Sequence, residues 1–95
     1  MVDGKTKSGF EFSINENIFK DWEFTELIDT LRIGGGTMKE INRVYIMVLG
    51  EEGFNNLKEH IRKEYGYVDI EAMKTEFNEI IGSAKVKNSS SSPSV

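Results

Sequence analysis

The chain has 95 residues, a net charge of −4 and no cysteine. This length suits one small domain, and the lack of cysteine excludes disulfides, thiolate zinc sites and cysteine nucleophiles. The acidic balance disfavours nucleic acid as the main partner, because that binding relies on Lys and Arg to neutralise phosphates. Hydrophobic residues make up 38% of the chain, with six Phe, three Tyr and one Trp, which is too many for a wholly disordered protein.

Residues 1–8 are mostly small and polar, and we expect them to form a flexible N-terminus with no signal-peptide core behind it. No apolar run approaches the roughly 18 residues that would span a bilayer. We therefore expect a cytoplasmic protein with no membrane partner.

Residues 9–14 alternate between apolar and polar side chains, which is the pattern of a half-buried strand. No other segment alternates as clearly, and Met1 and Val2 leave little chain for a hairpin. Two arrangements stay open. The strand lies against the helices as an extended arm, or it pairs with the same strand of a neighbouring subunit.

Four short amphipathic helices are predicted to follow, near residues 21–33, 37–49, 51–65 and 69–84. The residues that cap them are Asp21, Thr37 with Glu40 as a capping box, and Asp69. Glycines at positions 34–36, 50 and 66 separate the helices.

The apolar pattern stops at residue 84, and the serine-rich stretch 85–95 is expected to be a disordered tail. The predicted fold is therefore mainly α. It consists of a single domain over residues 9–84, with about four helices in a small bundle and an N-terminal extended or β arm.

No residue set indicates catalysis, a metal or a cofactor, so we expect a protein that is not an enzyme. His60 is the only histidine and has no companion ligands at metal-binding spacing. The glycines before Thr37 open a helix, but a phosphate loop would need a preceding strand and a Lys-Ser or Lys-Thr pair. The acidic residues of the first helix are expected on its solvated side.

Three aromatic residues are the candidates for a binding surface, whereas most of the others are expected in the core. Phe10, Phe12 and Trp22 lie on or beside the strand whose partner is unknown. An aromatic cluster there would suit self-association or partner binding.

The order of these features resembles the tail assembly chaperones of long-tailed, siphovirus-type bacteriophages and prophages of Gram-positive hosts. The similarity covers roughly residues 9–89 and begins with the strand-like segment and the first apolar helix. Three later segments carry it further: Leu49-Gly50-Glu51-Glu52, Gly66-Tyr67-Val68-Asp69-Ile70-Glu71 and Lys87-Asn88-Ser89.

This resemblance implies a non-catalytic role in the cytoplasm of the bacterial host. Such chaperones bind the long helical tape-measure protein, keep it soluble while the tail tube assembles, and are not expected in the mature virion. A programmed frameshift near the end of the gene would yield a longer form that recruits tail-tube protein. Self-association into a homo-oligomer would let several copies coat one long partner.

Two other functions remain open. One is a small helical DNA-associated regulator, in which the second and third helices loosely mimic a helix-turn-helix. Against it, Glu51 and Glu52 would repel phosphate at the start of a recognition helix. The other is a structural component that stays in the virion.

Overall fold

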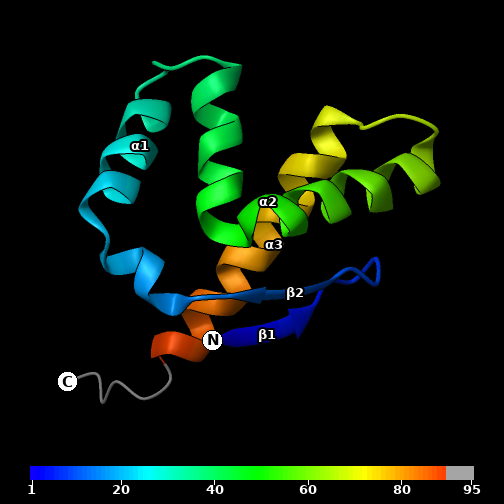
Figure 1. The fold of residues 1–95 in the computed structure, drawn as a ribbon, viewed down its shortest axis with the longest axis horizontal. Coiled ribbons are helices and arrows are strands. Elements are labelled where there is room, and N and C mark those ends of the chain that lie inside the picture. The colour runs from blue at the N-terminus through cyan, green and yellow to red at the C-terminus, as the bar shows by residue number, and fades with distance from the viewer. Residues whose placement is uncertain (90–95) are drawn as a thin grey trace.

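A computed structural model describes residues 1–89, with side chains described as far as residue 84. Within this range the protein is mainly helical with one small sheet (Figure 1), which confirms the predicted fold class in outline. The elements in chain order are β1 (Val2–Lys5), β2 (Glu11–Ile14), the 3-10 helix η1 (Glu16–Lys20), α1 (Trp22–Arg32), α2 (Met38–Tyr65) and α3 (Ile70–Ser89).

The two strands form an antiparallel hairpin in which Val2 faces Ile14 and Gly4 faces Phe12. The turn is closed by hydrogen bonds from the Thr6 amide to the Phe10 carbonyl and from the Gly9 amide to the Thr6 carbonyl, both 2.9 Å. The prediction that residues 1–8 are flexible is therefore wrong for the paired residues 2–5. The predicted strand pairs with β1 of the same chain, an arrangement that the sequence did not indicate.

Gly4 explains how a strand of only four residues, β1, can pair with β2 and cover Phe12. A Cβ atom at this position would lie 2.5 Å from Cζ of Phe12, so the aromatic ring covers the backbone of β1 where a glycine leaves room. The four residues of β1 thus bury one face of Phe12 by backbone contact rather than by large side chains of their own.

The predicted helix caps are confirmed. The Asp21 carboxylate accepts a hydrogen bond from the Phe24 amide at 2.8 Å, and the Asp69 carboxylate accepts one from the Ala72 amide at 2.9 Å. Thr37 and Glu40 form the reciprocal capping box that begins α2. These side chains satisfy amides that have no partner within the helix itself.

The structure has three α-helices within residues 1–89 rather than the four predicted, because segments 37–49 and 51–65 form one element, α2. Gly50 lies at the junction with φ 80° and ψ 163°, outside the helical region. The helix therefore bends there without a connecting loop, and its two arms run in different directions (Figure 1).

The last helix, α3, extends to Ser89 instead of ending at residue 84. The helix thus continues into the first part of the predicted tail, and residues 90–95 lie outside the described residues. Residues 83–89 contain neither glycine nor proline, so nothing in this stretch interrupts a helical backbone.

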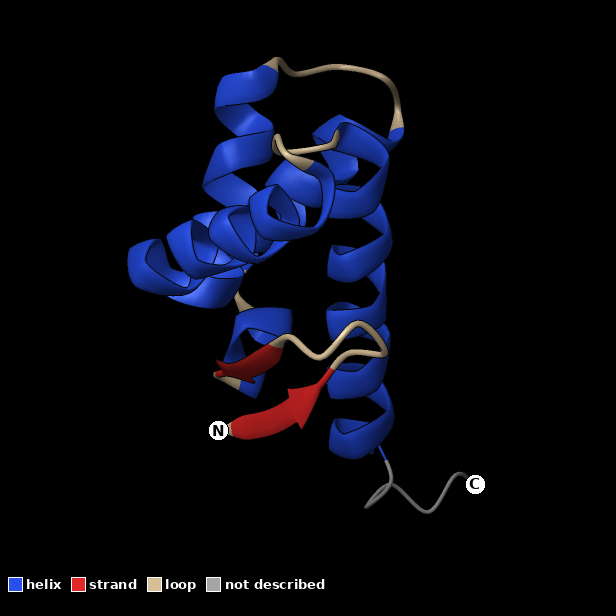
Figure 2. Ribbon diagram, turned by 90° about the vertical axis from the view of Figure 1, so that its right-hand side faces the viewer, coloured by secondary structure: helices blue, strands red, loops and turns tan. Residues whose placement is uncertain are grey.

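One core joins the hairpin to the helices. The hairpin lies beside α3 (Figure 2), and β2 also contacts α2. The most deeply buried side chains come from β2, α2 and α3: Ile14, Leu57, Ile61 and Ile80. The large apolar side chains of α2 and the described part of α3 are mostly buried or half-buried, and the exposed ones are Met38, Tyr65 and Ile70. Among the described residues, no helix combines the length and apolar character that crossing a membrane requires.

Candidate functional site

A largely apolar groove of about 150 Å³ lies between the two arms of α2 and the start of α3. The bend at Gly50 makes this groove, because it sets the first arm at an angle to the second. The lining residues are Met38, Ile41, Asn42, Tyr45, Phe54, Lys58, Val68, Ile70, Met73 and Lys74.

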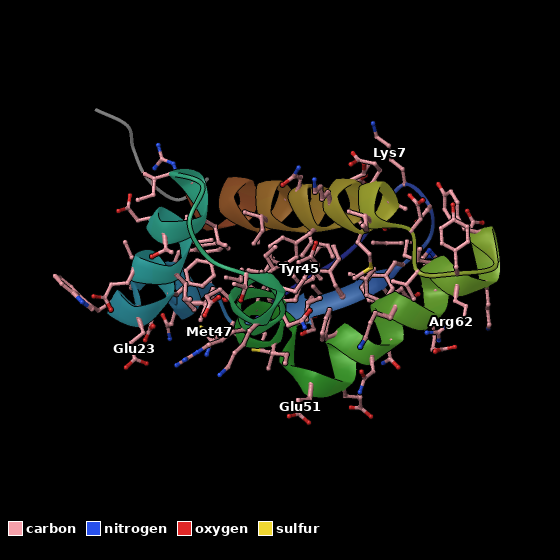
Figure 3. All side chains as sticks on the ribbon, turned by 90° about the horizontal axis from the view of Figure 1, so that it is seen from above. Lys7, Glu23, Tyr45, Met47, Glu51 and Arg62 are labelled. Carbon is pink, nitrogen blue, oxygen red and sulfur yellow. The ribbon has the colours of Figure 1, made fainter. Side chains whose placement is uncertain are left out.

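The floor of the groove is aromatic and belongs to the core. Tyr45 stacks on Phe77 with ring centroids 4.1 Å apart, and it also meets Phe54 at 5.3 Å. Figure 3 shows Tyr45 in the interior between α2 and α3, whereas Glu51 and Arg62 point outward. Burial raises the pKa of the Tyr45 hydroxyl from 10.0 to about 12, because the phenolate would be poorly solvated there.

Both charged residues of the lining are lysines, although the whole chain is acidic. Nζ of Lys58 lies 4.3 Å from the centroid of the Phe54 ring, a cation–π contact. Lys74 pairs with Glu71 at 3.6 Å across one turn of α3. The groove is therefore apolar within and has the ammonium group of Lys58 at its edge, which suits an apolar segment that carries an acidic flanking residue.

Two large apolar side chains of the lining remain open to solvent. Met38 is 62% exposed at the start of α2 and Ile70 is 66% exposed at the start of α3. Exposed apolar residues that adjoin an apolar groove are typical of a binding surface, whereas single scattered ones are not.

The structure does not bring the three aromatic residues predicted for binding onto one surface. Phe10 and Phe12 are each only 7% exposed and belong to the core, because β1 and the helices cover the strand. Trp22 is 77% exposed on α1, where it borders a shallow hollow formed by that helix alone.

Sequence reasoning missed the groove residues Ile70, Lys58 and Lys74. Ile70 is three residues before Met73, and this spacing placed it on the buried stripe of its helix. It is instead 66% exposed, although it lines the groove beside residues of α2. The sequence did not indicate that Lys58 and Lys74 line a common groove, since only the bend at Gly50 brings them together there.

Nε2 of His60 shares a hydrogen bond of 2.8 Å with Oγ of Ser8 in the hairpin turn. Across the part of the chain that the structure describes, no three His, Cys, Asp or Glu residues form a group that could hold a metal ion. The geometry of the groove instead suits the binding of an apolar segment.

Comparison of the chain with protein-family models, with curated proteins and with solved structures found no match. The groove and the order of features in the sequence are therefore the two observations from which a function can be inferred.

Proposed function

We propose that this chain is a tail assembly chaperone of a long-tailed phage or prophage. It binds amphipathic helical segments of the tape-measure protein and keeps that protein soluble during assembly of the tail tube. The observation that carries the proposal is the apolar groove between the arms of α2 and the start of α3.

A groove of this kind is suited to a helix. Amphipathic helices bind by placing an apolar face into an apolar groove, with anchors at three- and four-residue spacing. Met38 and Met73 both line the groove, and the flexible thioether of methionine adapts to irregular partners. A chaperone that meets many segments of one long protein needs this tolerance more than it needs tight shape complementarity.

The charges support the same role. The net charge of −4 favours solubility of the complex. Lys58 would pair with an acidic residue beside an apolar stretch of the partner, which sets orientation and speeds association more than it adds affinity.

The test is co-expression with the tape-measure protein and measurement of the soluble fraction. Ile70→Ser removes an exposed apolar anchor from the groove, and Ile33→Ser removes one that is 78% exposed elsewhere. We expect Ile70→Ser to weaken binding about tenfold, since fully burying such a side chain contributes about 1.5–3 kcal/mol. Ile33→Ser should bind as the parent does. Equal binding by both variants would place the partner outside the groove.

Two further measurements separate this function from its alternatives. Mass spectrometry of products from the native gene should find a minor longer protein that continues in a shifted frame, and analysis of purified virions should not find this chain. Abundant chain in virions would favour a structural component, and tight binding to DNA in a low-salt gel shift would favour a regulator.

A further inference from the structure

A second hollow, of about 190 Å³, lies where the hairpin turn, the end of α2 and the start of α3 meet. It differs in character from the apolar groove. Its polar lining includes Ser8, His60, Glu64, Asp69, Glu71 and Glu76. Four of these six are carboxylates, and no lysine or arginine of the described residues lines it.

Glu76 is the unusual member of this set. It is only 6% exposed, and its Oε1 atom has no hydrogen-bond partner among the described residues. The other buried polar side chain, Thr6, accepts a hydrogen bond from the Phe10 amide at 3.1 Å. Burying a carboxylate without a donor or a positive charge carries a large desolvation cost, so a residue left in this state indicates a missing partner.

Two of the other acids already have partners. The Asp69 carboxylate caps α3 through the Ala72 amide, and Glu71 pairs with Lys74. Glu64 also lines the hollow and is exposed, so its carboxylate adds to the negative charge of the lining around Glu76.

We propose that this hollow is a binding site for an organic cation, an ammonium or guanidinium group, with Glu76 as its main acceptor. A guanidinium donates several hydrogen bonds in one plane and pairs with carboxylates in a bidentate manner. The terminal torsion of Glu is broad, so either oxygen of Glu76 can turn toward a donor without rotamer strain. The ring of Tyr65, which also lines the hollow, provides a face for the cation.

Size and geometry favour this class of ligand. A volume of 190 Å³ corresponds to about six water molecules at roughly 30 Å³ each, which is ample for a guanidinium and below the range of drug-sized ligands. A metal ion is disfavoured because no three candidate ligands in the described residues come close enough together. The site does not depend on the groove or on the chaperone function.

The cation has two possible sources, a free polyamine or the side chain of an arginine or lysine on a protein partner. Agmatine, which has both a guanidinium and an ammonium group, serves as the free probe. A short peptide with one arginine between alanines serves as the second. Tighter binding of the peptide identifies a protein side chain as the natural ligand, and tighter binding of agmatine identifies a free cation.

The experiment is a titration of the intact chain with each probe, followed by NMR amide shifts and calorimetry. Glu76→Gln keeps the shape of the side chain and removes its charge, and the matched control Glu52→Gln changes an exposed carboxylate on the outside of α2. We expect saturable shifts at the hollow in the parent, at least tenfold weaker binding in Glu76→Gln, and unchanged binding in Glu52→Gln.

A second variant covers the case in which Glu76→Gln does not fold. Glu64→Gln alters an exposed residue of the lining and leaves the core intact, and it should weaken binding by a smaller factor than Glu76→Gln. The proposal is overturned if neither probe shifts the residues of the hollow, or if a folded Glu76→Gln binds the cation as tightly as Glu52→Gln does. Where Glu76→Gln does not fold, equal binding by the Glu64 and Glu52 variants overturns it.

Discussion

Tyr45 connects the core of the protein to its candidate groove. Its ring is 7% exposed, contacts the rings of Phe54 and Phe77, and forms part of the groove floor. A side chain that serves both purposes links partner binding to stability, so changes at this position will affect both. Its hydroxyl also gives the fold a dependence on pH.

The pKa of Tyr45 is raised from 10.0 to about 12 in the folded protein, so the folded state binds its proton more tightly than the unfolded state does. Below about pH 10 this stabilisation is fully present, and it is lost as the pH rises to about 12. We expect a loss of up to about 3 kcal/mol once the pH has passed through this interval, from two pKa units at about 1.4 kcal/mol each.

The measurement is urea unfolding of the parent and of Tyr45→Phe at several pH values between about 9 and 12. Phenylalanine keeps the ring contacts and has no proton to lose, so the stability difference between the two proteins should change only above about pH 10. A difference that stays constant across the interval would show that the hydroxyl reaches solvent.

Predictions made residue by residue succeed where the physical cause is local. The caps at Asp21, Thr37 and Asp69 depend on neighbours two or three residues away, and the sequence displays those neighbours. Glu76 was not predicted to be buried, although it lies three residues after Met73 and four before Ile80, both of them core residues. Helical spacing therefore places Glu76 on the buried face of α3, but a charged side chain is not expected there from the sequence.

Gly50 determines the geometry of α2. Its φ and ψ angles, 80° and 163°, fall in a region that is essentially restricted to glycine. A Cβ atom at this position would meet nothing within 4 Å, so the effect of a substitution would come from the backbone alone. The sequence indicated a helix boundary here but gave no sign that the helix bends instead of ending.

Gly50→Ala should lower the free energy of unfolding by about 1–3 kcal/mol because alanine cannot adopt this conformation without strain. The matched control is Gly82→Ala in α3, where the backbone is helical and the added methyl also meets nothing. That change should raise stability by about 0.5–1 kcal/mol. If both variants gained stability in urea unfolding, α2 would be able to straighten at no cost.

Of the two strands of the hairpin, β2 could be predicted from the sequence and β1 could not. The alternation of residues 10–14 marked β2 clearly, but β1 contains Asp3, Gly4 and Lys5, which are poor strand formers. Its position depends on pairing and on the ring of Phe12 over Gly4, which are contacts across a turn. Propensity within a window of a few residues does not contain this information.

Phe12 is buried in the core and Trp22 is exposed on α1, although their proximity in the sequence suggested one shared binding surface. Phe12→Ser should destabilise the protein by about 3–5 kcal/mol, because it opens a cavity in the core and removes the cover of Gly4. Trp22→Ser should change stability by less than about 0.5 kcal/mol, because that side chain is already exposed.

Circular dichroism during urea unfolding measures both stabilities, and sedimentation of the two variants measures self-association. If Trp22 mediates contact between copies, its variant will be less associated and equally helical. Retained helicity and stability in Phe12→Ser would contradict its placement in the core and favour a role in binding instead.

The groove could not be predicted from the sequence because it is formed by three segments that are distant along the chain. Met38 and Tyr45 come from the first arm of α2, Lys58 from the second, and Ile70 from the start of α3. Each has an ordinary place in its own helix. Only the bend at Gly50 and the return of α3 place them on one surface.

The contact between the hairpin and α3 has a consequence for synthesis of the protein. Ile14 completes the hairpin, but Ile80 of α3 emerges from the ribosome about 66 residues later, which takes about 3–13 s at roughly 5–20 residues per second. Until then the apolar face of the hairpin lacks the helix that covers it. The rate of translation therefore determines how long this face can meet other nascent chains, and slow codons before α3 would lengthen that exposure without altering the folded protein.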